Sequence, residues 1–104
     1  MALTLKPGSR LFGAACTTEL IVVKAPAHAA DVRIGGHPAV ADAGERDDTL
    51  VVTTSPEAKA LMGKRYVDAD GDLELLCTKA GDGAAAVGDT LLALKDAKPL
   101  PASD

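Results

Sequence analysis

The chain has 104 residues, a formal net charge of −4 and two aromatic side chains, Phe12 and Tyr66. This length fits one domain spanning residues 1–104 around an aliphatic core, and an acidic chain without rings for base stacking argues against nucleic acid as a partner. The longest apolar runs, such as residues 20–23, are far shorter than the roughly 20 residues of a membrane-spanning helix. Residues 1–10 lack the apolar centre of a secretory signal, so we expect a cytoplasmic protein with no membrane partner.

The first half of the chain reads as short extended segments joined by turns. The expected strands are residues 10–12, 19–23, 31–34 and 37–41. The clearest of them, residues 19–23, is rich in β-branched side chains, which favour strands. Pro26 ends this strand, and the pair Gly35-Gly36 supplies the turn between the last two.

The connection between the halves is first polar and then apolar. Residues 42–48, DAGERDD, are expected to form a solvated acidic loop. Residues 50–53, LVVT, read as a strand. A short helix is expected near residues 56–62, because Ser55 can cap it, Pro56 suits its first position and Gly63 ends it.

The second half reads as two hairpins followed by a tail. The expected strands are residues 65–67, 73–78, 84–87 and 90–94. Asp-Gly at positions 70–71 and Gly-Asp at positions 88–89 are the residues that tight hairpin turns favour. The tail, residues 95–104, contains Pro99 and Pro101 and is expected to lie extended on the surface.

Two segments of the chain, residues 6–26 and 61–81, align without a gap at an offset of 55, with 7 of 21 positions identical. Glu19 matches Glu74 and Leu20 matches Leu75, and after a short gap residues 34–36 fall against residues 87–89. Such self-similarity indicates a repeated structural unit.

The predicted fold is therefore mostly β: a small barrel or sandwich built from two repeated β units, about 6–40 and 61–95, with one short helix near 56–62. The repeat itself is clearest over residues 6–40 and 61–94. Alternation within the strands predicts that most of the core comes from Leu20, Val22, Leu73, Leu75 and Leu92.

Two turns bracket the first hairpin: Gly13-Ala14-Ala15-Cys16 precedes the strand 19–23, and Ile34-Gly35-Gly36 follows it. In this arrangement residues 10–40 resemble the desulforedoxin family of small rubredoxin-like metal domains, in which Cys-x-x-Cys-Gly leads through a hairpin to Cys-Cys-Gly. Cys16 stands at one of the four thiolate positions, and the other three are occupied by Gly13, Ile34 and Gly35. The resemblance implies a hairpin scaffold that has lost most of its metal ligands.

Cys16 and His37 are the residues that could still serve a metal, although we expect no metal and no other cofactor. Tetrahedral zinc or iron takes four N or S ligands, and this chain offers one thiolate with His37 near the second turn. A dimer would supply two of each across its axis. Residues 68–74 resemble part of a calcium loop, but Gly71 comes too early for that motif, so a solvated turn is favoured.

Cys16 and Cys77 show no motif spacing and are expected to be free thiols in the core, so we assign no catalytic residue and expect no enzyme. The leading interpretation is a non-catalytic β accessory or assembly subunit that acts through protein–protein interaction. Its partner is another protein or a second copy, in a homodimer or larger complex, with the strand 50–53 as the pairing edge. The alternative is a metal- or thiol-dependent, rubredoxin-like binding or redox protein that uses Cys16 and His37.

Overall fold

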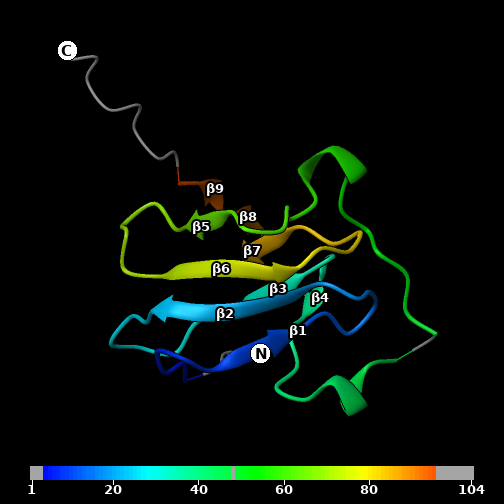
Figure 1. The fold of residues 1–104 in the computed structure, drawn as a ribbon, viewed down its shortest axis with the longest axis horizontal. Coiled ribbons are helices and arrows are strands. Elements are labelled where there is room, and N and C mark those ends of the chain that lie inside the picture. The colour runs from blue at the N-terminus through cyan, green and yellow to red at the C-terminus, as the bar shows by residue number, and fades with distance from the viewer. Residues whose placement is uncertain (1–3, 48, 96–104) are drawn as a thin grey trace.

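The computed structural model describes residues 4–47 and 49–95, which form two antiparallel β-sheets packed face to face (Figure 1). The first sheet has the strand order β1-β2-β6-β5-β9, and the second has the order β4-β3-β7-β8. The strands of the first sheet are β1 (Arg10–Phe12), β2 (Glu19–Lys24), β5 (Arg65–Val67), β6 (Glu74–Lys79) and β9 (Ala93–Leu94). Those of the second are β3 (Val32–Ile34), β4 (His37–Pro38), β7 (Ala85–Val87) and β8 (Thr90–Leu91). The mostly β fold is confirmed, whereas a closed barrel is not formed by the described residues.

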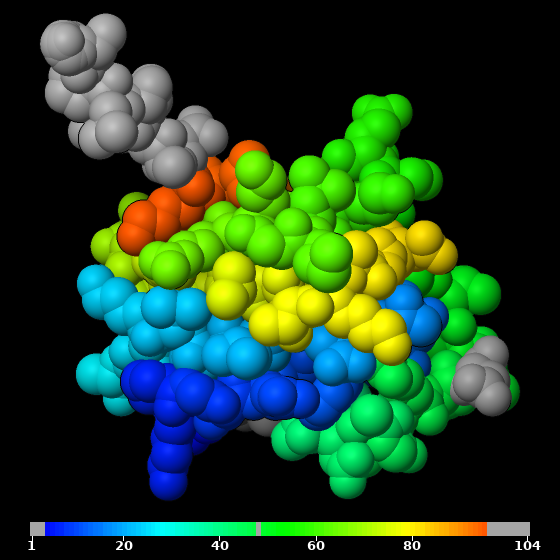
Figure 2. Space-filling view, viewed as in Figure 1, coloured from blue at the N-terminus to red at the C-terminus, as the bar shows by residue number. Residues whose placement is uncertain are grey.

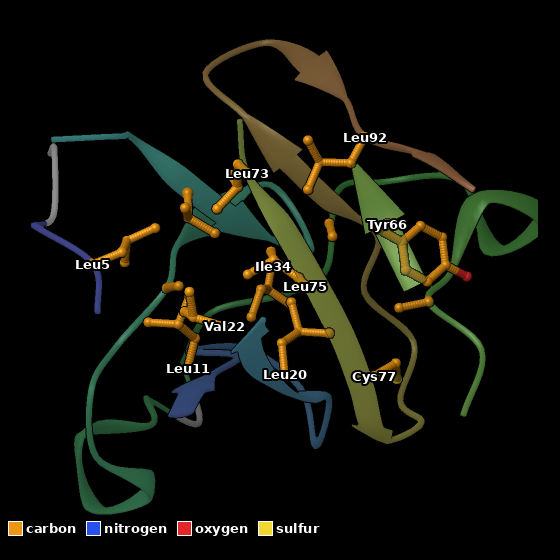
Figure 3. Close-up of a cluster of buried hydrophobic side chains, with 14 of the residues drawn as sticks. Leu5, Leu11, Leu20, Val22, Ile34, Tyr66, Leu73, Leu75, Cys77 and Leu92 are labelled. Carbon is orange, nitrogen blue, oxygen red and sulfur yellow. The ribbon is translucent and has the colours of Figure 1, made fainter. Parts of the chain in front are cut away.

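The centre of the first sheet is the antiparallel pair β2 and β6, the two longest strands. Their central register is Leu20↔Cys77, Ile21↔Leu76 and Val22↔Leu75. Because side chains alternate between the faces of a strand, Leu20 and Leu75 both point toward the second sheet and are fully buried (Figure 3).

The strands of the two halves begin at constant separations along the chain. β1 begins at Arg10 and β5 at Arg65, 55 residues later, and the same separation relates β2 to β6. β7 and β8 each begin 53 residues after β3 and β4. The pairs β2–β6 and β3–β7 join one half to the other.

The core lies between the two sheets and is almost entirely aliphatic (Figure 3). All five candidate residues, Leu20, Val22, Leu73, Leu75 and Leu92, are buried, but they are five of the fifteen described core residues, so the prediction that they supply most of the core is wrong. The second sheet adds Val32 and Ile34, which are completely excluded from solvent. Tyr66 is also buried, and its hydroxyl accepts a hydrogen bond of 2.9 Å from the Leu61 amide.

The two hairpins expected in the second half are confirmed. β5 pairs with β6 across the loop that contains Gly71, and β7 pairs with β8 across Gly88. Both glycines have positive φ angles, 74° and 58°, which glycine adopts without the strain that a side chain would cause.

The helix expected near residues 56–62 is wrong, because the structure has a single 3₁₀ turn, η2 (Pro56–Ala58). Ser55 does cap it, since the Ser55 hydroxyl accepts a hydrogen bond from the Glu57 amide. Beyond Ala58, however, the amide of Ala60 donates to the Gly83 carbonyl at 3.0 Å and the Leu61 amide donates to Tyr66. These tertiary hydrogen bonds use the amides that a longer helix would need.

The strand expected at residues 50–53 is also wrong. This segment pairs with no strand among the described residues and instead crosses the Gly35-Gly36 turn, where the Thr53 amide donates to the Gly35 carbonyl at 2.9 Å. A side chain at Gly36 would collide with the Thr53 hydroxyl, so the glycine permits this crossing. The loop 42–48 contains a 3₁₀ turn, η1 (Ala43–Glu45), while residue 48 and the tail 96–104 lie outside the described residues.

Replacing Leu75 with alanine should lower the free energy of unfolding by about 2–5 kcal/mol, because Leu75 is fully buried between the sheets and the truncation leaves a cavity. Chemical denaturation measures this change. Val51→Ala is the matched control, since Val51 is 71% exposed and its truncation should cost less than about 0.5 kcal/mol. Equal losses in the two variants would contradict the described core.

Candidate functional site

Cys16 lies in the loop between β1 and β2, in contact with residues from both halves of the chain. Its thiol lies 3.4 Å from the hydroxyl of Thr18, which is fully buried. A β-carbon at Gly13 would lie 2.5 Å from the Cys16 sulfur, and one at Gly83 would lie 2.8 Å from it. Two glycines therefore make room for this thiol.

The four positions of the metal-knuckle resemblance lie close together in the fold. A β-carbon at Gly13 would contact both Cys16 and Ile34, at 2.5 and 3.2 Å. A β-carbon at Gly83 would lie 2.8 Å from the Cys16 sulfur and 2.8 Å from the Gly35 amide nitrogen, so Gly83 bridges these two positions. These four positions contribute one thiol, whereas a tetrahedral metal site needs four ligands.

His37 is held by the connector between the halves and not by Cys16. Its Nε2 lies 2.6 Å from the Val51 carbonyl oxygen, a hydrogen bond in which the nitrogen is the donor. Among residues 4–47 and 49–95, no group of three or more His, Cys, Asp or Glu side chains lies close enough to hold a metal ion. The two candidate residues therefore do not form a site within one chain.

The two cysteines are free thiols, Cys16 partly exposed and Cys77 buried. Cys77 is buried in β6, where burial raises the pKa of its thiol and disfavours the reactive thiolate. Cys16 borders an open cleft of about 260 Å³ whose walls include Arg46, Asp47 and Leu50. Arg46 is occupied there, since it donates to the carbonyls of Gly13 and Thr17, each at 3.3 Å.

Two glutamates, Glu19 on β2 and Glu74 on β6, each have two cationic partners. Glu19 lies 3.5 Å from Arg46 and 3.9 Å from Lys79. Glu74 is buried and lies 2.8 Å from Lys95 and 3.2 Å from Arg65. The hydrogen bond from Lys95, with further attraction from Arg65, lowers the pKa of Glu74. Lys79 and Arg65 join neighbouring strands, whereas Arg46 and Lys95 lie outside the strands.

A hollow lined by leucines together with charged Glu57 and Lys59 opens where the edges of the two sheets meet in the second half. Three leucines around it are exposed: Leu61 by 44%, Leu91 by 52% and Leu94 by 43%. Its volume is about 240 Å³, and buried Tyr66 and Leu92 contribute to its floor. β9, orange in Figure 2, lies against the green of β5 beside this hollow. We call Leu61, Leu91 and Leu94 the leucine surface.

The leucine surface was not predicted from the sequence, although one signal for it was present. Residues 90–94 were expected to be a strand with Leu92 in the core, and alternation then places Leu91 on the opposite face. Leu61 was placed in the expected helix, which does not form. Its exposure depends on the irregular segment that follows η2, and no local pattern encodes that segment.

Comparisons with protein-family models, with curated proteins and with solved structures found no match to this chain. No helix within residues 4–47 and 49–95 has the length and apolar character needed to cross a membrane. The functional argument therefore rests on the chain's own surfaces.

The purified protein should carry no stoichiometric zinc or iron, because one thiol at the four knuckle positions cannot hold these ions tightly. Elemental analysis of protein purified without chelator measures this content. Near-stoichiometric metal that disappears in both Cys16→Ser and His37→Ala would contradict the expectation and indicate a site shared between two chains.

Glu74→Gln should make the protein less sensitive to acid. The pKa of Glu74 is lowered in the folded protein. Its carboxylate therefore stabilises the fold fully at pH values above the pKa of an unfolded glutamate, about 4.3. This stabilisation is lost as the pH falls toward the lower pKa of the folded state. Stability measured by denaturation between about pH 7 and pH 3 should fall less steeply in the variant. Exposed Glu45→Gln is the control, and an identical slope in Glu74→Gln and the wild type would refute this role.

Proposed function

We propose that this protein is a non-catalytic β module, built from two copies of one β unit, that acts by binding another protein through the leucine surface. The proposal has two parts, the duplication and the binding surface. The exposure of Leu61, Leu91 and Leu94 around one hollow is the observation that carries the functional part.

The duplication is supported by hydrogen bonds that recur at the same offset as the sequence match. The Gly8 amide donates to the Val22 carbonyl at 2.7 Å, and the Gly63 amide donates to the Cys77 carbonyl at 2.8 Å. The bridge between Phe12 and Val40 likewise has its counterpart in the pairing of β5 with β9. Unrelated segments would have no reason to share both residues and hydrogen bonds at one offset.

The pairing between the halves also has the form expected of two copies related by a twofold axis. In such an interface, if residue i of one copy meets residue j of the other, then j meets i. Leu20 pairs with Cys77, and the equivalent pair, Val22 with Leu75, is present in the same ladder. Glu19 pairs with Lys79 and Lys24 with Glu74 in the same reciprocal way.

Binding through the leucine surface is favoured because its residues gather at unprotected sheet edges. β8 ends the second sheet and β9 ends the first, and both strands contribute an exposed leucine to the rim of the hollow. Exposed aliphatic side chains around a concave, partly apolar floor are typical of protein-interaction sites. An edge strand beside them offers backbone groups for strand addition.

A photo-reactive residue placed at position 91 should cross-link a protein in the source organism, because Leu91 stands on the rim of the hollow. Mass spectrometry of the product identifies the partner, and a product of twice the mass of the chain would identify a second copy. The same residue at position 51 is the control, since Val51 is also exposed but lies on the connector. Absence of any product from position 91, or equal products from both positions, would refute binding through this surface.

A further inference from the structure

In the first half, the connector of residues 46–53 covers the loop between β1 and β2 and the turn after β3. The Asp47 amide donates to the Ala14 carbonyl at 2.8 Å, and the Thr53 amide donates to the Gly35 carbonyl at 2.9 Å. Between these two contacts the Val51 carbonyl meets His37. The described residues of the connector therefore contact both this loop and this turn, and the Leu50 amide closes a turn on the Asp47 carbonyl at 3.1 Å.

In the second half, the equivalent surface is not covered by residues 4–47 or 49–95. Offsets of 55 and 53 relate Ala14 to Ala69 and Gly35 to Gly88. Ala14 and Gly35 are buried, whereas Ala69 is exposed and nothing among the described residues lies within 4 Å of a β-carbon at Gly88. No described residue donates a hydrogen bond to the carbonyl of Ala69 or Gly88.

A groove of about 210 Å³ lies at this place, between the β5–β6 loop and β8. Asp68 and Asp70 line one wall, and Val87, Thr90 and Leu91 line the other. Half-exposed Leu91 and buried Leu92 line both this groove and the hollow of the leucine surface, so the two depressions are neighbours.

The open surface differs from the covered one in charge. Four uncharged residues of the first half have aspartates at the equivalent positions of the second: Gly13, Ala15, Thr17 and Gly36 correspond to Asp68, Asp70, Asp72 and Asp89. Over the covered loop, Arg46 donates to the Gly13 and Thr17 carbonyls and reaches Glu19. A cationic side chain placed equivalently in the second half would meet aspartates in addition to carbonyl oxygens.

We propose that the groove between residues 68–70 and β8 binds a positively charged segment of a different protein, which lies as the connector lies in the first half. This inference rests on the proposed function and names the kind of partner. Backbone amides of the bound segment meet the free carbonyls of Ala69 and Gly88, its Lys or Arg side chains meet the aspartates, and an apolar side chain packs on Leu91.

Charge argues against two other segments of this chain as the occupant, the connector and the tail. A second copy would offer its own connector, whose residues 42–48 contain four acidic residues and one Arg. The tail, residues 96–104, has two Asp and one Lys. Neither segment is net positive, so neither complements a groove lined by Asp68 and Asp70.

Two synthetic peptides test this proposal on the full chain labelled with ¹⁵N. One has the sequence of residues 43–53, and the other has the same sequence with Glu45→Lys, Asp47→Lys and Asp48→Lys. The basic peptide should shift the amide resonances of residues 68–72 and 87–91 and bind about tenfold more tightly than its acidic parent, with the difference shrinking as salt is raised.

Paired variants make the charge requirement specific. The double variant Asp70→Asn, Asp89→Asn should weaken binding of the basic peptide several-fold. The control, Glu45→Gln with Asp82→Asn, removes the same number of charges from exposed sites elsewhere and should leave binding of the basic peptide unchanged. Equal weakening by both pairs, equal binding of both peptides, or shifts at residues 13–17 and 35–37 would overturn the proposal.

The remaining outcomes separate this proposal from the proposed function. If position 91 cross-links a protein but neither peptide shifts the groove, the charged-segment inference fails and protein binding stands; if both tests fail, both proposals fall. Concentration-dependent shifts without peptide would identify a second copy as the occupant. Peptide binding that appears only in a chain ending at Lys95 would identify the tail, and either result would overturn the inference.

Discussion

The pairing of β2 with β6 is the contact on which the rest of the fold depends. It places Leu20 and Leu75 side by side over the second sheet and brings Glu19 and Glu74 to positions where cations from loops and neighbouring strands reach them. Every other strand of the first sheet is attached through one of these two. A change of register by one residue would turn the buried leucines to solvent, so the inward side chains themselves fix the register.

The hairpins and the buried strand residues could be predicted from the sequence, because turn residues and alternation within strands determine them. A Gly with a positive φ marks each of the two turns in the second half, and alternation identified the inward residues of β2 and β6. The predictions of a helix near 56–62 and of a strand at 50–53 were wrong for the same reason. In both segments an amide donates a hydrogen bond to a carbonyl that is distant in sequence, that of Gly83 or Gly35. No local sequence pattern predicts such partners.

The candidate site was harder to predict than the fold. Cys16 and His37 are the residue types that chemistry most often uses, and yet the structure gives Cys16 a hydroxyl neighbour and His37 a backbone carbonyl. The leucine surface, in contrast, consists of residues that usually signify a core. Their exposure follows from two sheet edges meeting with no described segment laid across them, which is a property of topology and not of composition.

The proposed duplication explains why the second half has an open groove where the connector covers the first half. Two copies of a β unit that pair about a twofold axis begin with two identical outer surfaces. Here the connector between the copies lies on the first surface and satisfies its carbonyls, so Gly13 and Gly36 can stay small and uncharged beneath it. The second surface is not covered by the described residues, and Asp68 and Asp89 stand there at the positions of Gly13 and Gly36. Aspartates favour the solubility of an open surface and favour a basic partner for it. We therefore assign the binding function to the second half.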